Sequence, residues 1–230
     1  MVSGGSFDGT ARVWNVESGE TVLAIETGFT LVEAVIYSPD GTSIGTCGDD
    51  EEKNFIKIWD SKSGELVANL RGHQRSVRCL AWTADGKTLV SGSIGIGSES
   101  IRTWNTTTWQ QNSILTEHFD GSIISISTSA ITISLNDRIL ASASYDGAVR
   151  LWNLENGQPI GSPLQHAHRD DGSAVACQCV AFSKDGDLLA TGCLDHNMYT
   201  WDVSAIVREP GLDDLPSNTN VSLVFSSYLH

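Results

Sequence analysis

The sequence predicts an all-β protein built from repeated antiparallel sheets. Three observations predict it: tryptophan recurs at a regular interval, short apolar segments alternate with tight-turn signals, and no window carries the apolar stripe of a long helix. The composition agrees, because 22 of the 230 residues are Gly, only 5 are Pro, and 18% are charged. A chain of this length can bury a substantial core.

The repeat is anchored on five tryptophans, each followed by Asp or Asn. They are Trp14, Trp59, Trp104, Trp152 and Trp201, at intervals of 45 to 49 residues. In three copies a Gly follows five residues after the Trp, as in "VWNVESG" and "LWNLENG". Self-similarity at such a period indicates a repeat architecture in which each unit is one supersecondary motif.

Two further strand signals precede each tryptophan segment. One contains a hydroxyl residue: "SIGTCGDD", "TLVSGSIG", "ILASASYD" and "LLATGCLD". The other ends in a turn: "YSPDG", "WTADG", "FSKDG" and a weaker "SLND". Asp-Gly between apolar runs predicts a hairpin, because Gly adopts positive φ without steric cost. Each unit therefore predicts three or four strands, which in the third unit are 77–83, 88–93, 101–105 and 113–117. A helical turn is expected at 204–208, before Pro210.

The combination of Gly-His, Ser-Pro-Asp-Gly, Ala-Ser-x-Ser-x-Asp and Trp-Asp/Asn resembles the WD repeat of β-propellers. The resemblance implies a propeller domain over 1–207, with about five four-stranded antiparallel blades. We expect units at 1–26, 27–71, 72–117, 118–165 and 166–207, the first without its innermost strand. A polar linker at 208–220 and a possible closing strand at 221–230 follow. An incomplete ring, a small closed ring and pairing with a second copy are all open at this point.

The resemblance also implies a structural hydrogen-bond network in each blade. A buried indole N–H can only donate, so a Ser or Thr hydroxyl accepts it and donates to a His, whose second nitrogen meets an Asp. The network positions are Thr46, Asp50, Trp59, His73, Ser91, Trp104, His118, Ser142, Asp146, Trp152, Thr191, Asp195 and Trp201, with His166 or His168 in the fifth unit. The second unit has "TGFTLV" and no His. In the third, Gly95 stands where the Asp is expected, and Glu99 is the nearest acid.

Ser, His and Asp together also resemble a hydrolase triad, so a propeller hydrolase with a site in its central channel is the alternative function. The set recurs within strands, however, and lacks the strained turn of G-x-S-x-G. The inner-strand segments "AVIYS", "CLAWT" and "CVAFS" offer apolar and small residues. We therefore expect no catalytic residue and no cofactor.

The five cysteines are expected to be buried and reduced, without a metal. They lie in apolar, strand-like segments, and their number is odd: Cys47, Cys79, Cys177, Cys179 and Cys193. No CxxC pair accompanies them, although zinc sites usually contain one.

Charge narrows the class of partner. The chain carries 14 basic and 28 acidic residues, a net charge of −14, which opposes binding to nucleic acid or an anionic membrane. A local basic cluster exists only at Arg71, Arg75 and Arg78. No signal-peptide pattern opens the chain, so the cytoplasm is the expected location, with the nucleus as a second option.

The expected function is a non-catalytic scaffold for protein–protein interaction, because loops on a stiff frame present side chains at low ordering cost. A ligand-sensing segment of a larger multidomain protein is a further alternative. In the family that the sequence resembles, contacts gather beside the turn before the Trp strand and the loop before the inner strand. Those places hold Phe7, Asp49, Arg75, Tyr145 and Leu194. Open blade edges could also pair with a second copy.

Overall fold

The protein is almost entirely β-structure, as the sequence predicts. The computed structural model describes residues 1–3, 7–50, 55–94, 101–116, 128–166 and 174–207. The expected linker at 208–220 and closing strand at 221–230 lie outside these residues. Within them are five antiparallel sheets and one short helix, α1 (Val203–Val207), close to the expected helical turn. No helix in the described ranges has the length and apolar character needed to span a bilayer.

Strands that are consecutive in the chain pair within each sheet. The first sheet contains β1 (Val2–Ser3), β2 (Thr10–Trp14) and β3 (Thr21–Glu26). The second contains β4 (Leu31–Tyr37), β5 (Ser43–Asp49), β6 (Ile56–Asp60) and β7 (Leu66–Leu70). The third contains β8 (Val77–Trp82), β9 (Thr88–Ser93), β10 (Ile101–Asn105) and β11 (Gln111–Leu115). The fourth contains β12 (Thr128–Ile133), β13 (Ile139–Ser144), β14 (Ala148–Asn153) and β15 (Pro159–Gln165), and the fifth β16 (Cys177–Phe182), β17 (Leu188–Cys193) and β18 (Met198–Asp202).

The turn between the first two strands of the second to fifth sheets has one recurring conformation. Gly41, Gly86 and Gly186 occupy it with φ of 70°, 71° and 81°, a region that Gly enters without a Cβ clash. In the fourth sheet Asp137 occupies it with φ of 58°, and Asp tolerates this region better than most residues. The weaker "SLND" signal therefore encodes the same turn as the three Asp-Gly signals.

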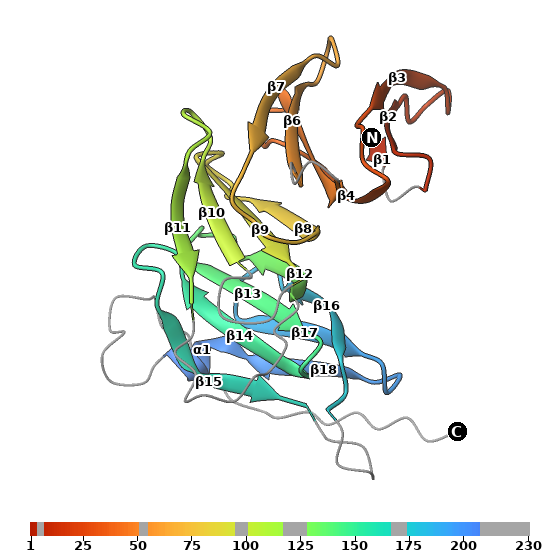
Figure 1. Ribbon diagram of the computed structural model, residues 1–230. Helices are drawn as coiled ribbons and strands as arrows, with labels where there is room; N and C mark the ends of the chain where they lie inside the picture. Colours follow the sequence, from red (N-terminus) through yellow and green to blue (C-terminus); the bar gives the residue numbers. More distant parts are fainter. Residues whose placement is uncertain (4–6, 51–54, 95–100, 117–127, 167–173, 208–230) are drawn as a thin grey trace.

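The five sheets follow one another along an arc (Figure 1). The inner strands β4, β8, β12 and β16 pack in sequence, and β1 and β2 pack against β4. Among the described elements, no comparable packing joins the fifth sheet to the first. The described part of the chain is thus an open series of propeller blades, which confirms the expected all-β fold class with about five blades.

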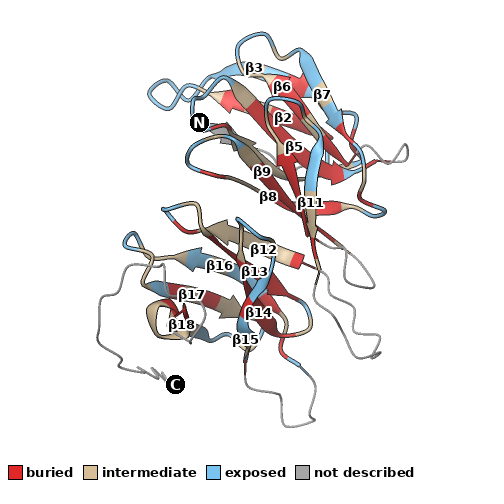
Figure 2. Ribbon diagram, turned by 90° about the vertical axis from the view of Figure 1, so that its left-hand side faces the viewer, coloured by how far each residue is buried: buried red, intermediate tan, exposed pale blue. Residues whose placement is uncertain are grey.

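Apolar clusters fill the space between neighbouring sheets. Figure 2 shows buried residues concentrated in the two middle strands of the sheets, such as β9, β13 and β14, whereas the outer strands β3 and β7 are mostly exposed. From the second sheet onward, the repeat tryptophan joins the cluster shared with the preceding sheet: Trp59, Trp104, Trp152 and Trp201. Each blade therefore depends on its neighbour to bury its apolar face, as expected for a repeat protein.

The clusters between sheets predict a large difference between two leucines of the fourth sheet. Leu140 is fully buried in the cluster shared with the third sheet, whereas Leu135 is 70% exposed. Leu140→Ala should lower the free energy of unfolding by about 2–5 kcal/mol, because it leaves a cavity. Leu135→Ala should change it by less than about 0.5 kcal/mol. Urea unfolding followed by tryptophan fluorescence measures both, and equal losses would contradict this description of the core.

Candidate functional site

Four of the repeat tryptophans donate a hydrogen bond from the indole to a hydroxyl on the neighbouring strand of the same sheet. The bond joins Trp59 Nε1 to Thr46 Oγ1 at 2.8 Å, Trp104 to Ser91 at 2.8 Å, Trp152 to Ser142 at 2.9 Å and Trp201 to Thr191 at 3.0 Å. The accepting hydroxyls belong to buried residues. The structure therefore brings together the Trp and hydroxyl positions that the sequence predicts in the second to fifth units.

Two histidines extend this bond in the third and fifth sheets. His73 Nε2 lies 2.7 Å from Ser91 Oγ, and His166 Nε2 lies 2.8 Å from Thr191 Oγ1. His166 Nδ1 lies 2.7 Å from the Gly147 carbonyl. A carbonyl only accepts, so Nδ1 carries the proton and Nε2 accepts from Thr191.

His166, rather than His168, therefore stands at the network position of the fifth unit. The other predicted histidine, His118, lies outside the described residues, as does His168.

The expected contact between His and Asp is absent where both partners are described. Asp195 accepts a hydrogen bond from Tyr199 at 2.5 Å, while the second nitrogen of His166 bonds to a backbone carbonyl. In the fourth sheet, whose predicted histidine lies outside the described residues, Asp146 pairs with Arg150, with 2.9 Å between the charged atoms. The physical reason is the spacing along the chain. Arg150 and Tyr199 each lie four residues after the Asp and two before the Trp, and their long side chains reach the carboxylate.

In the second sheet Phe29 stands where the histidine is expected, beside a buried cation. Phe29 follows Gly28, as His73 follows Gly72, and Lys57 Nζ lies 4.4 Å from the Phe29 ring centroid. Lys57 also pairs with Asp50 at 2.9 Å, and both side chains are nearly buried. Removal of either partner would leave an uncompensated buried charge, which is strongly destabilising.

This cationic position was not among the predicted network residues, although the sequence contains a repeated basic residue that indicates it. Four repeats carry a basic residue two positions before the Trp: Arg12, Lys57, Arg102 and Arg150. In the third sheet Arg102 donates to Gln111. The residues considered there for the acid, Gly95 and Glu99, lie outside the described residues.

Burial controls the protonation of His73. Desolvation, with a smaller contribution from the nearby Arg102 charge, lowers the pKa of His73 to about 3. The imidazole is therefore neutral in the folded protein at neutral pH, and its Nε2 contacts Ser91 without a charge.

The five predicted partner-binding residues are all exposed and lie at the same end of their sheets; we call this set the contact face. Its members are Phe7, Asp49, Arg75, Tyr145 and Leu194. Each lies at or beside the end of the strand that precedes the Trp strand, or just before the inner strand, of its sheet. In an antiparallel sheet those two places are adjacent, as the pairs Leu31–Asp49 and Cys177–Cys193 show.

One polar row crosses the contact face between blades. Arg78 on β8 donates to the Tyr145 hydroxyl at 2.7 Å, and its guanidinium lies 5.6 Å from the Tyr145 ring centroid. Arg78 Nε lies 3.8 Å from Glu33 Oε1 on β4. The row therefore links the second, third and fourth sheets.

The described residues contain one cluster with side chains of metal-ligand type: His166, Cys177 and Cys193, whose donor atoms lie within 4.8 Å of one another. Both nitrogens of His166 already take part in hydrogen bonds. Desolvation raises the pKa of both Cys177 and Cys193, so the thiols are protonated at neutral pH. In this state the cluster offers no free anionic ligand.

The indole–hydroxyl bond should be measurable in the fourth sheet. Ser142→Ala leaves the buried Trp152 Nε1 without its acceptor and should lower the free energy of unfolding by about 1–3 kcal/mol. The same change in a Trp152→Phe background should cost less, since no indole N–H remains. Ser162→Ala, at an exposed position of β15, is the control and should have almost no effect on chemical denaturation. Equal losses in the presence and absence of Trp152 would contradict the bond.

The neutral His73 predicts a loss of stability in mild acid. An unfolded His binds a proton near pH 6.5 and the folded His73 only near pH 3, so the unfolded chain binds more protons between these values. His73 should therefore contribute a loss of about 2 kcal/mol between pH 7 and pH 5. His73→Asn should remove this contribution, and His196→Asn, at an exposed position, should retain it. Urea unfolding at the two pH values tests this, and the same pH dependence in all three proteins would contradict it.

Comparison with known proteins agrees with this geometry. A model of the family "WD domain, G-beta repeat" matches residues 64–105, 109–153 and 159–202, more than half of the chain. Autophagy-related protein 16 of Arabidopsis thaliana is 25% identical over 171 residues, which cover 74% of this chain and 30% of the relative. The guanine nucleotide-binding protein subunit beta of Zea mays is 26% identical over 237 residues, covering 97% of this chain and 60% of the relative.

A third relative is the U3 small nucleolar RNA-associated protein 15 homolog of Bos taurus, 29% identical over 107 residues, or 46% of this chain and 19% of the relative. The chain spans less than two thirds of the length of each of these relatives. Each matched repeat includes the outer strand of one sheet and the first three strands of the next, and ends just after a tryptophan that makes the indole–hydroxyl bond: Trp104, Trp152 or Trp201. The protein therefore belongs to the WD-repeat family.

Proposed function

We propose that this protein is a non-catalytic scaffold that binds other proteins through its contact face. The observation that carries the proposal is the exposure of large side chains on that face, held by a rigid frame. Phe7 is 89% exposed, Leu194 43% and Tyr145 36%. Aromatic residues and arginine are enriched among the residues that dominate binding energy at interfaces.

The row formed by Glu33, Arg78 and Tyr145 supports this proposal. Arg78 orients the Tyr145 ring through a hydrogen bond and a cation–π contact, so little rotamer entropy remains for Tyr145 to lose on binding. Because the row spans three sheets, a partner seated on it would contact several blades at once.

Burial of the network hydroxyls supports a non-catalytic role. Ser91, Ser142 and Thr191 are between 0% and 4% exposed, and each accepts an indole hydrogen bond. A nucleophile must reach its substrate and be activated by a base, whereas these hydroxyls are enclosed between sheets. Their arrangement accounts for structure better than for hydrolysis.

The proposed partners are proteins or peptides, and the proposed location is the cytoplasm or nucleus. The net charge of −14 favours partners with basic surfaces over nucleic acids or anionic membranes. The chain could also associate with a second copy of itself, because the unpaired strand edges at the ends of the arc can pair with another chain.

Affinity capture with matched variants tests the contact face. Tyr145→Ala and Arg75→Glu should each lower the recovery of proteins captured by the wild-type chain, by about tenfold for a central contact. Val16→Ala and Lys62→Glu make the same kinds of change at exposed positions on the opposite end of the sheets, and should leave recovery unchanged. Quantitative mass spectrometry of the captured fractions provides the measurement. Identical recovery with all four variants would reject the contact face as the binding surface.

A further inference from the structure

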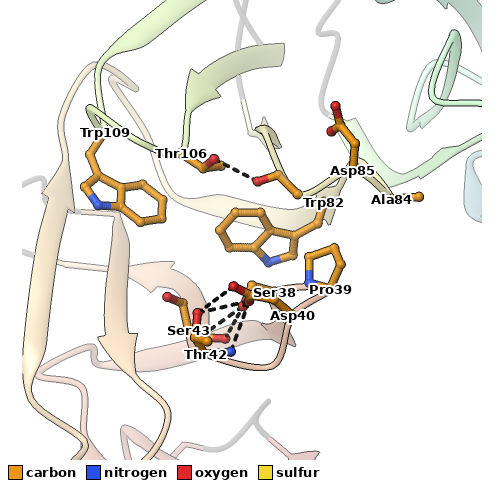
Figure 3. A pocket seen from close by; sticks show the side chains of 11 residues that line it. Ser38, Pro39, Asp40, Thr42, Ser43, Trp82, Ala84, Asp85, Thr106 and Trp109 are labelled. Atoms are coloured by element: carbon orange, nitrogen blue, oxygen red, sulfur yellow. Dashed lines mark hydrogen bonds between the residues drawn. The ribbon is translucent and has the colours of Figure 1, made fainter.

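A cavity of about 390 Å³ lies between the second and third sheets, at the end opposite the contact face. Three turns form its walls: β4–β5, β8–β9 and β10–β11 (Figure 3). Its volume is within the range of small-ligand sites in proteins. We call it the tryptophan pocket, after Trp82 and Trp109.

The two tryptophans outside the repeat pattern meet in this pocket. Five of the seven tryptophans are the repeat anchors, and the other two are Trp82 and Trp109. Their ring centroids are 6.0 Å apart, with an interplanar angle of 77°. Trp82 stands where two other repeats also have an aromatic residue, Tyr37 and Phe182, whereas Trp109 has no aromatic counterpart in the other repeats.

Trp109 adopts a backbone conformation that favours glycine. It stands five residues after Trp104, where three other repeats have a glycine: Gly19, Gly64 and Gly157, with φ of 70°, 72° and 73°. Trp109 has φ of 57°. A bulky residue is rarely found in this region, so the chain places an indole here against a steric preference.

Trp82 contributes a hydrogen-bond donor that is not used within the described residues. Its Nε1 is buried without a partner. In Figure 3 this nitrogen lies on the edge of the ring that faces Ser38 and Pro39. An unpaired buried donor is costly, so the chain holds this edge of the indole against the 38–39 turn at the expense of a hydrogen bond.

Two carboxylates make the pocket negative. Hydrogen bonds from Ser38 and Thr42 lower the pKa of Asp40, and hydrogen bonds from Lys87 N and from Thr83 lower that of Asp85, so both are ionised at neutral pH. Asp137 does not line the pocket, but its carboxylate accepts from the backbone of Ala84 and Asp85 at 2.6 and 2.9 Å and so holds the β8–β9 turn.

One lysine pairs with Asp85 at the rim of the pocket. Lys87 lies 3.2 Å from Asp85, but its side chain is 81% exposed, so an incoming cation can displace it at little cost.

We propose that the tryptophan pocket binds an arginine side chain from a basic peptide segment of a partner protein. The guanidinium stacks on the indole of Trp109 or Trp82 and pairs with Asp40 or Asp85. Arginine fits better than lysine, because its planar group stacks on aromatic faces and pairs with carboxylates in a bidentate manner. This site goes beyond the proposed function, because it lies at the other end of the sheets from the contact face.

The test uses the full chain and a fluorescently labelled Gly/Ser peptide that carries arginine, with fluorescence anisotropy as the readout. Trp109→Gly should weaken binding by about tenfold, since it removes the indole. The variant retains the fold, because three other repeats have Gly there with the same backbone angle. Trp109→Asn is a second variant, since Asn also tolerates this region. Circular dichroism confirms folding of both.

Matched variants test whether the carboxylates of the pocket contribute to peptide binding. Asp40→Asn and Asp85→Asn should each weaken binding and reduce its dependence on salt. Asp185→Asn is the control, because Asp185 makes the equivalent turn contact with Ser183 in the fifth sheet, away from the pocket. It should bind the peptide as the wild type does.

Several outcomes would overturn the proposal. They are the absence of wild-type binding, equal affinity in Trp109→Gly, or equal affinity for a peptide with citrulline in place of arginine. Equal affinity for a lysine peptide would overturn the assignment to arginine. Tyr145→Ala should leave peptide binding unchanged, and Trp109→Gly should leave capture at the contact face unchanged, so the two proposals can fail separately.

Discussion

The hydrogen bond from a buried indole to a strand hydroxyl is the interaction on which the rest of this structure depends. The large apolar ring fills the space between two sheets, while its N–H needs an acceptor that water cannot supply there. A Ser or Thr on the adjacent strand meets that need within the same sheet. Packing between blades and register within a blade are therefore set by the same residue.

The polar groups around this bond vary far more than the bond itself. The third and fifth sheets use a histidine, and the second uses the Lys57 cation over Phe29. The Asp of the turn pairs with a lysine in the second sheet, an arginine in the fourth and a tyrosine in the fifth. Each combination satisfies the carboxylate, so the blade retains its shape while its sequence diverges. This freedom explains why the motif is recognisable at only 25–29% identity to the relatives.

The two ends of the sheets differ in chemistry although the same strands form both. The contact face carries exposed aromatic and apolar side chains, with Arg78 as its central cation. The opposite end has carboxylates that are held in tight turns beside the two additional tryptophans. A rigid stack of blades keeps the two surfaces apart, so that one chain could hold two partners of different charge at the same time.

The class of fold, the repeat and the bonded Trp–hydroxyl pairs could all be predicted from the amino-acid sequence. Tryptophan spacing and Asp-Gly turns are local signals, and a one-residue slip in a strand would turn its apolar side chains away from the core. The expected turn at 134–137 and the strand bounds of β9 and β10 could be predicted for this reason. The indole acceptors followed because a buried donor has few partners within one sheet.

The ion pairs of the turn Asp residues and the tryptophan pocket, in contrast, follow from how the sheets pack in three dimensions. The partner of each Asp depends on side-chain length and on the neighbouring ring, as Lys57 and Phe29 show. The tryptophan pocket combines turns from two different sheets, and Trp82 and Trp109 come together only when those sheets pack. No local pattern encodes a contact between blades, because it depends on the rotation from one blade to the next.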